Sequence, residues 1–204
     1  MTDLPALSPR QRILEAVVTC IEKDGFNNLT TRKIAEQAGT NIASINYYFR
    51  SKDLLVTEAL AMTLQHMMED VFALIEAPER PFPEMLEEVF TYLIDGGLRF
   101  PGTIMAHLYP VLVERRTDTP VVQDFHKVFE LLVGRAAREY PAIPLDDLRL
   151  ALAQVLSSAI FTMLSPGFFR LVAPLDLSQP EAPGLLARYL RQAFTKSVEI
   201  GLRE

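Results

Sequence analysis

Cysteine is nearly absent from this chain of 204 residues, which contains Cys20 alone. A single thiol excludes an internal disulfide and any zinc site built from several cysteines, and it is typical of a reducing compartment. The first ten residues lack the charged start and apolar core of a signal peptide, and no apolar run is long enough to span a membrane. We therefore expect a cytoplasmic protein without a membrane partner.

Sequence motifs of catalysis are also lacking. The chain contains no GxSxG, P-loop, GxGxxG or HExxH pattern. Its three histidines, His66, His107 and His126, are not spaced as zinc ligands. We expect no catalytic residue, no metal and no cofactor. An enzyme with a pocketed helical body is the rival interpretation, but no residue pattern proposes a reaction for it.

A strong excess of basic charge is missing from the chain as a whole, whose formal net charge is -6. This excludes a uniformly basic nucleic-acid binder. The charge is unevenly distributed, because residues 1–55 carry seven basic and six acidic side chains, a net of +1, which leaves -7 for the rest. A locally basic head on an acidic body fits a protein that touches phosphate at one end only.

Sustained alternation of polar and apolar residues is absent, so the sequence predicts no β-sheet. Prolines and glycines instead separate segments with apolar residues three or four positions apart, the period of an amphipathic helix. Ser8, Pro9 and Gln11 predict the first helix start, because they combine a cap, a tolerated proline and a capping box. We expect an all-α fold with helices near residues 9–24, 30–37, 41–49, 52–75, 83–98, 102–115, 120–139, 145–164 and 182–202.

The second and third predicted helices are short and meet at Gly39, which is the pattern of a helix-turn-helix. Ala35 is small where the two helices cross, and Ile34, Ile45 and Phe49 supply a small core. With Ile45 buried, a rotation of about 100° per residue points four side chains of the third helix toward solvent. These are Ala43, Ser44, Asn46 and Tyr47.

Such a face suits a DNA major groove, where asparagine pairs with adenine and small apolar groups meet thymine methyls. Donors suited to phosphate surround it, and Lys52 also lies near the start of the fourth helix, where free backbone N–H groups attract anions. These donors are Thr31, Arg32, Tyr48 and Lys52. The alternative interpretation is a solvated polar face on a small helical bundle.

Five stretches of the head carry a family resemblance: residues 12–16, 25–26, 29–35, 38–39 and 47–55. Their turn, core and phosphate positions together resemble the TetR family of bacterial transcriptional regulators. Thr40 departs from the family pattern, because an apolar residue usually follows the turn glycine there. Asn46 also departs at a position that bears on the DNA sequence recognised.

The resemblance implies a DNA-binding domain in residues 1–52 and a helical ligand-binding and dimerisation domain in residues 53–204, joined by a long helix. It further implies a repressor that leaves its operator when a small-molecule effector binds. Thr31 and Arg32 would hold phosphate, and Ser44, Tyr47, Tyr48 and Lys52 would mostly hold the DNA backbone. Ile42, Ala43 and Asn46 would face bases, although the angle of Ile42 also allows it to flank the small core. Activation in place of repression uses the same head.

The last predicted helices carry apolar stripes that fit either a dimer interface or a core within one chain. The resemblance favours a homodimer, and two heads would read a palindromic operator more selectively than one. The expected interface residues are Leu152, Leu156, Ala159, Leu186, Leu190, Ala193, Phe194, Ser197 and Gly201.

An effector pocket would lie in the body, and an unidentified small molecule is the expected ligand. Candidate lining residues are Met62, His66, Phe90, Met105, His107, Phe125, Phe129 and Phe161. Packing in the core is the alternative role for most of them. A DNA-binding protein without a ligand is a further alternative, against which the large apolar body argues.

Overall fold

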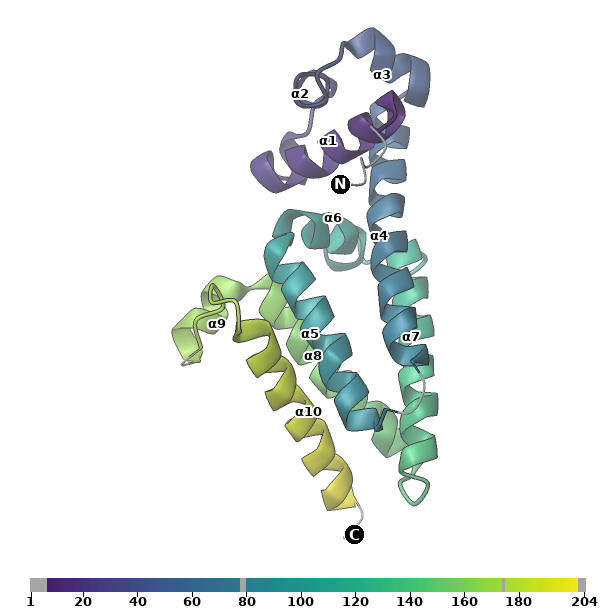
Figure 1. Cartoon of the computed structure of the whole chain (residues 1–204), viewed down its shortest axis with the longest axis vertical. Helices are drawn as coiled ribbons and strands as arrows, with labels where there is room; N and C mark the ends of the chain where they lie inside the picture. Colours follow the sequence, from purple (N-terminus) through teal and green to yellow (C-terminus); the bar gives the residue numbers. More distant parts are fainter. Residues whose placement is uncertain (1–6, 78–79, 174, 202–204) are drawn as a thin grey trace, which may run out of the picture. The chain divides into compact units, whose positions relative to one another are not determined.

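The computed structural model describes residues 7–77, 80–173 and 175–201. Every regular element in these residues is helical, which confirms the predicted all-α class (Figure 1). The elements are α1 (Pro9–Asp24), η1 (Phe26–Asn28), α2 (Thr31–Gln37), α3 (Ile42–Phe49), α4 (Lys52–Glu76), α5 (Phe82–Arg99), α6 (Pro101–Leu112), α7 (Pro120–Glu139), α8 (Leu145–Leu164), α9 (Pro166–Val172) and α10 (Ala182–Gly201).

The helix starts form where local capping chemistry predicts them. Ser8 and Gln11 exchange backbone and side-chain hydrogen bonds in a capping box, with Pro9 in the first turn of α1. The Asn41 side chain accepts from the Ser44 N–H at 2.8 Å and so caps α3. The Ser51 hydroxyl accepts from the Leu54 N–H at 3.2 Å, which caps α4.

The chain divides into two compact units, Met1–His66 with Gly102–Thr117, and Met67–Pro101 with Asp118–Glu204. The first unit therefore contains α1 to α3, the beginning of α4 and nearly all of α6. The first compact unit is thus larger than the predicted DNA-binding domain, which ends at residue 52. That division concerns function, and it stays a prediction.

The first unit is built around a core from α1, α2, α3 and the beginning of α4. Ile13, Val17, Ile34 and Ile45 are fully or almost fully buried in it. Ala106 of α6 is buried in the same core, so α6 is an integral part of this unit. Each such side chain, removed from water, stabilises the unit by about 1.5–3 kcal/mol relative to exposure.

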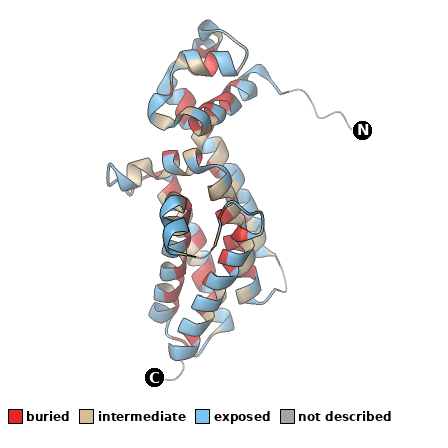
Figure 2. Cartoon of the chain, turned by 90° about the vertical axis from the view of Figure 1, so that its left-hand side faces the viewer, coloured by how far each residue is buried: buried red, intermediate tan, exposed pale blue. Residues whose placement is uncertain are grey.

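In the second unit, α10 packs on α5 and α8, and α7 packs on α8 and α5. Three phenylalanines, Phe82, Phe90 and Phe194, are buried at its centre, and the rings of Phe82 and Phe194 lie 5.2 Å apart. Buried residues follow the inner faces of these helices, and exposed residues cover the outer faces (Figure 2). This arrangement explains the helical period of the apolar residues.

Candidate nucleic-acid interface

The turn between α2 and α3 depends on Gly39, whose φ of +62° lies in the region that favours glycine. The Thr40 N–H then donates to the carbonyl of Ala35 at 2.9 Å. Thr40 is half-buried, so a threonine is accommodated where the family usually has an apolar residue. The chain enters α3 directly after this turn, which fixes the crossing of the two helices.

Two buried residues hold α3 against the core of the first unit. Ile45 and Phe49 are buried one turn apart, and both belong to the core of the first unit. The Arg10 guanidinium lies 5.1 Å from the centre of the Phe49 ring in a cation–π contact, and Arg10 also pairs with Glu58 of α4. The start of α1, the end of α3 and the start of α4 are thereby joined around one aromatic ring.

The opposite side of α3 is open to solvent. Ala43 and Asn46 are exposed, and Tyr47 retains 82% of its accessible surface. Ile42 is 46% exposed, which favours its surface role over its alternative role in the core. Tyr48 lies at the edge of this face, with its ring 5.2 Å from that of Tyr47 in an edge-on contact. The structure therefore gathers Ile42, Ala43, Asn46, Tyr47 and Tyr48 on one surface.

Three of the four remaining predicted DNA contacts, Arg32, Ser44 and Lys52, already have partners within the head. Arg32 is exposed and pairs with Glu36 at 3.1 Å, while Thr31 is half-buried in the first turn of α2. The Ser44 hydroxyl donates to the Asn41 side chain at 3.2 Å. The Lys52 ammonium donates to the Leu29 carbonyl at 3.3 Å, which leaves two of its three hydrogens for phosphate.

One part of the head was not anticipated from the sequence, namely the attachment of α6 to α1. The Glu22 carboxylate accepts hydrogen bonds from the backbone N–H groups of Gly102 and Thr103, at 2.9 and 2.6 Å, and from the Thr103 hydroxyl at 2.5 Å. A carboxylate at a helix N-terminus satisfies free N–H groups and meets the positive end of the helix dipole. The helical pattern of α1 predicts only that Glu22 faces solvent, so nothing in the sequence indicated its contact with α6.

The same helix α6 carries His107, which is half-buried beside α4. The His107 Nε2 lies 2.9 Å from the Thr63 hydroxyl oxygen. Burial lowers the pKa of His107 to about 4, because the imidazolium loses hydration that no carboxylate replaces. A neutral ring is therefore held in the first unit at physiological pH.

The eight predicted effector residues are divided between the two compact units. The first unit holds half of them: Met62 and His107 are half-buried, while His66 and Met105 are exposed. In the second unit, Phe90 is buried, Phe125 and Phe129 are half-buried, and Phe161 is exposed. None of the eight residues lines the groove between α4 and α7. The effector pocket therefore stays a prediction.

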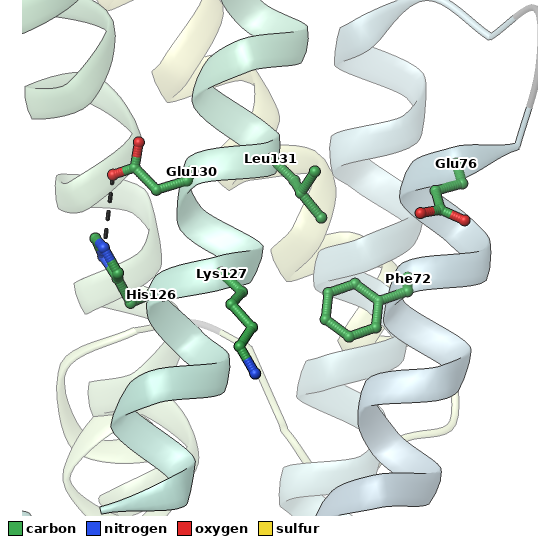
Figure 3. Close-up of a pocket in the computed structure, with 6 residues that line it drawn as sticks. All are labelled: Phe72, Glu76, His126, Lys127, Glu130 and Leu131. Atoms are coloured by element: carbon green, nitrogen blue, oxygen red, sulfur yellow. Dashed lines mark ion pairs between the residues drawn. The ribbon is translucent and has the colours of Figure 1, made fainter. Parts of the chain in front are cut away.

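A groove of about 560 Å³ lies in the second unit between the last turns of α4 and the middle of α7 (Figure 3). Phe72 from α4 and Leu131 from α7 point toward one another across it, and Glu76 and Lys127 lie beside them. His126 and Glu130 complete the lining, and Glu130 forms a two-pronged pair with Arg149 at 2.8 and 2.7 Å. The groove joins an apolar floor to charged rims, which suits a small amphipathic molecule.

The predicted dimer residues fall into two groups by burial. Five are buried within the single chain, and Leu156 is half-buried beside them; the buried residues are Leu152, Ala159, Leu186, Leu190 and Phe194. Ala193 and Ser197 are exposed on α10, and Gly201 is its last residue. Ala193 and Ser197 are thus the part of the prediction that is available to a second copy, and the burial of Gly201 lies outside what the structure describes.

Metal binding and membrane insertion are two further functions on which the described residues bear. They contain no group of three His, Cys, Asp or Glu side chains placed to hold a metal ion. By length and composition alone, α8 could cross a membrane. Its packing against α5, α7 and α10 accounts for its apolar character, since a core helix has the same composition.

Comparison with known proteins agrees with this geometry. Residues 13–59 match the model of bacterial regulatory proteins of the tetR family. The probable HTH-type transcriptional regulator YttP of Bacillus subtilis (strain 168) is 22% identical over 212 residues, covering 97% of this chain and 93% of YttP. The nicotine-responsive transcriptional repressor HdnoR of Paenarthrobacter nicotinovorans is 29% identical over 153 residues, covering 72% of this chain and 79% of HdnoR.

Solved structures show the same fold. A TetR transcription regulator from Haloarcula marismortui ATCC 43049 superposes with a TM-score of 0.67 at 17% identity, covering 95% of this chain and 97% of that one. The family match covers most of α1 to the beginning of α4, the segment that contains the turn, the core and the exposed face of α3. Residues 13–59 thus form the N-terminal domain found in bacterial regulatory proteins of the tetR family, and the whole chain has the fold of such regulators.

Proposed function

We propose that this protein is a homodimeric transcriptional repressor that leaves a palindromic operator when a small molecule binds its body. The observation that carries the proposal is the face of α3, where Ala43, Asn46 and Tyr47 are exposed while Ile45 and Phe49 anchor the helix below. A rigidly held polar helix face is what major-groove recognition requires. We assign DNA binding to residues 1–52 and effector binding and dimerisation to residues 53–204.

In the proposed complex, α3 lies in the major groove. Asn46 pairs with an adenine edge, and Ile42 and Ala43 contact thymine methyl groups. The other donors of the head hold the DNA backbone and set the register; they are Thr31, Arg32, Ser44, Tyr47, Tyr48 and Lys52. For Arg32 the DNA phosphate would replace Glu36 as the partner, since both side chains are exposed.

A second copy of the chain would dock on the outer faces of α8 and α10. Large apolar side chains are exposed there, including Leu150 on α8 at 64% and Tyr189 on α10 at 67%. Exposed apolar patches of this kind mark interaction sites. Ala193 and Ser197 lie on the same exposed side of α10 as Tyr189, four and eight residues later, so two copies of α10 could approach closely.

Effector control would act as a shift between two populations. The ligand favours a geometry of the body in which the two α3 helices no longer match the spacing of the operator. A coupling free energy of about 1–3 kcal/mol is sufficient for regulation. The contact of Glu22 with the start of α6 supports this route, because a displacement of α6 would act directly on α1. The name of HdnoR, a nicotine-responsive repressor, supports an organic effector.

The test is selection of operator DNA from random duplexes by the purified chain, followed by a metabolite screen on the selected complex. We expect a two-fold symmetric sequence, protected against nuclease cleavage, and at least one compound that weakens binding tenfold or more. Selection of sequences without symmetry would contradict the dimer, and DNA affinity that no compound changes would contradict effector control.

A further inference from the structure

The residue after α3 has an unusual backbone. Arg50 has φ of +61° and ψ of -38°, and the N–H of Ser51 donates to the carbonyl of Phe49 at 2.6 Å around it. This is close to a γ-turn of positive φ, which is rare and strained for a residue with a side chain. Glycine would relieve the strain, so the arginine side chain itself requires an explanation.

The cations of the head differ in whether they have partners. Arg10 pairs with Glu58, Arg32 with Glu36 and Lys33 with Asp24, while Arg12 and Lys52 donate to the carbonyls of Leu7 and Leu29. Arg50 is exposed and forms no side-chain hydrogen bond or ion pair with any described residue. Arg50 is therefore the cation at the end of α3 whose side chain has neither a hydrogen-bond nor an ion-pair partner among the described residues.

The position of Arg50 continues the exposed face of α3. Its N–H still donates to the carbonyl of Asn46 at 3.1 Å, as in the helix. Asn46 is one turn earlier and Ala43 two turns earlier, so the three residues share one side of α3. A long cationic side chain at the edge of a base-reading face lies where a DNA phosphate passes.

We propose that Arg50 is a phosphate-binding residue of the DNA interface, and that the strained turn aims its guanidinium at the backbone beside the bases that α3 contacts. This inference rests on the proposed DNA-binding role of α3. It assigns the backbone contact at the end of α3 to Arg50 in addition to Lys52, whose ammonium is partly engaged with the head.

The experiment measures binding of a random-sequence 30-base-pair duplex across a salt series, because a phosphate contact does not require the operator. For Arg50→Gln we expect roughly three- to tenfold weaker binding at low salt. The slope of log K against log salt should shrink by about 0.9 for each protomer on the DNA. Arg50→Lys should retain most of the slope, because it keeps the charge.

Lys23→Gln is the matched control. Lys23 is an exposed cation without an ion pair among the described residues. It lies thirteen residues along α1 from Arg10, about 20 Å, whereas Arg10 itself contacts Phe49 at the end of α3. Lys23→Gln should leave the slope unchanged. An unchanged slope for Arg50→Gln, or equal reductions for both variants, would overturn the assignment of Arg50. Failure of the unaltered protein to bind any duplex would instead overturn the proposed function together with this inference.

Discussion

Asn46 is the residue on which base selection by α3 depends in the proposed complex, because its side-chain amide is exposed and can donate and accept together. We expect Asn46→Ala to relax the preference at one base-pair position and to weaken operator binding by about 1–3 kcal/mol. The measurement is affinity for operators that carry single base-pair changes.

Lys52→Ala is the contrasting variant. It should weaken all sequences alike and flatten the salt dependence by about one unit of slope for each contact. Losses that are equal for the two variants and independent of salt would contradict the division between base and backbone contacts.

His107 makes a prediction about pH. Its pKa is about 4 in the folded chain, against about 6.5 in an unfolded chain. Above pH 6.5 both states hold the neutral ring, so the free energy of unfolding gains nothing from this residue. As the pH falls from 6.5 toward 4, the unfolded chain takes up the proton first, and the folded state loses up to about 3 kcal/mol.

Chemical denaturation of the unaltered protein and of His107→Gln between pH 7 and pH 4 measures this effect. Because carboxylates titrate in both proteins, the difference between the two curves isolates His107. We expect the unaltered protein to lose more stability than the variant over this interval. Parallel curves would show that burial of the neutral ring does not oppose its protonation.

At the scale of helices, the fit of α6 against α1 has little tolerance. A Cβ at Gly102 would lie 2.8 Å from the carbonyl oxygen of Ile21 and 3.0 Å from the Glu22 carboxylate. Because a backbone oxygen cannot move aside easily, Gly102→Ala should destabilise the chain by about 1–3 kcal/mol. It should also weaken the attachment of α6, which amide hydrogen exchange of Thr103 would detect.

Gly134→Ala provides the control for this substitution. Gly134 lies inside α7 with nothing within 4 Å of its added Cβ, so alanine should stabilise the helix by about 0.5–1 kcal/mol. Opposite signs for the two glycines would support the close approach of α6 to α1. A stabilising effect of Gly102→Ala would contradict it.

Helix positions were predictable from the sequence where local chemistry decides them, as at Ser8, Asn41 and Ser51. The helix α9 was not expected, because seven residues between two prolines are too short for a periodic pattern. The inclusion of α6 in the head depends on Ala106 and Glu22, whose partners are more than 40 residues away in the chain. Such long-range contacts carry no local signal, so the sequence predicted the face of α3 but not what supports the head.

The apolar stripes of α8 and α10 also show what a sequence pattern cannot predict, namely the partner against which a helix packs. Leu186, Leu190 and Phe194 belong to a helical stripe that predicts burial, and they are buried. The pattern cannot say whether the partner is the same chain or a second copy, because both remove apolar surface from water in the same way. Ala193 and Ser197 are exposed within one chain, so substitutions at these two positions can test for a second copy without disturbing the core.

For the whole molecule, the proposed repression requires two heads at a fixed spacing, so we expect operator binding to depend on a dimer. Ala193→Arg places a charge in the proposed interface without entering the core of the chain. We expect a monomer in place of a dimer by sedimentation, and operator affinity at least tenfold weaker, because an unpaired buried charge is strongly unfavourable. Gln123→Arg, the same charge change on the exposed side of α7, should alter neither.

A dimer that persists in both Ala193→Arg and Ser197→Arg would show that α10 does not form the interface, and the palindromic operator would then need another pairing of the heads.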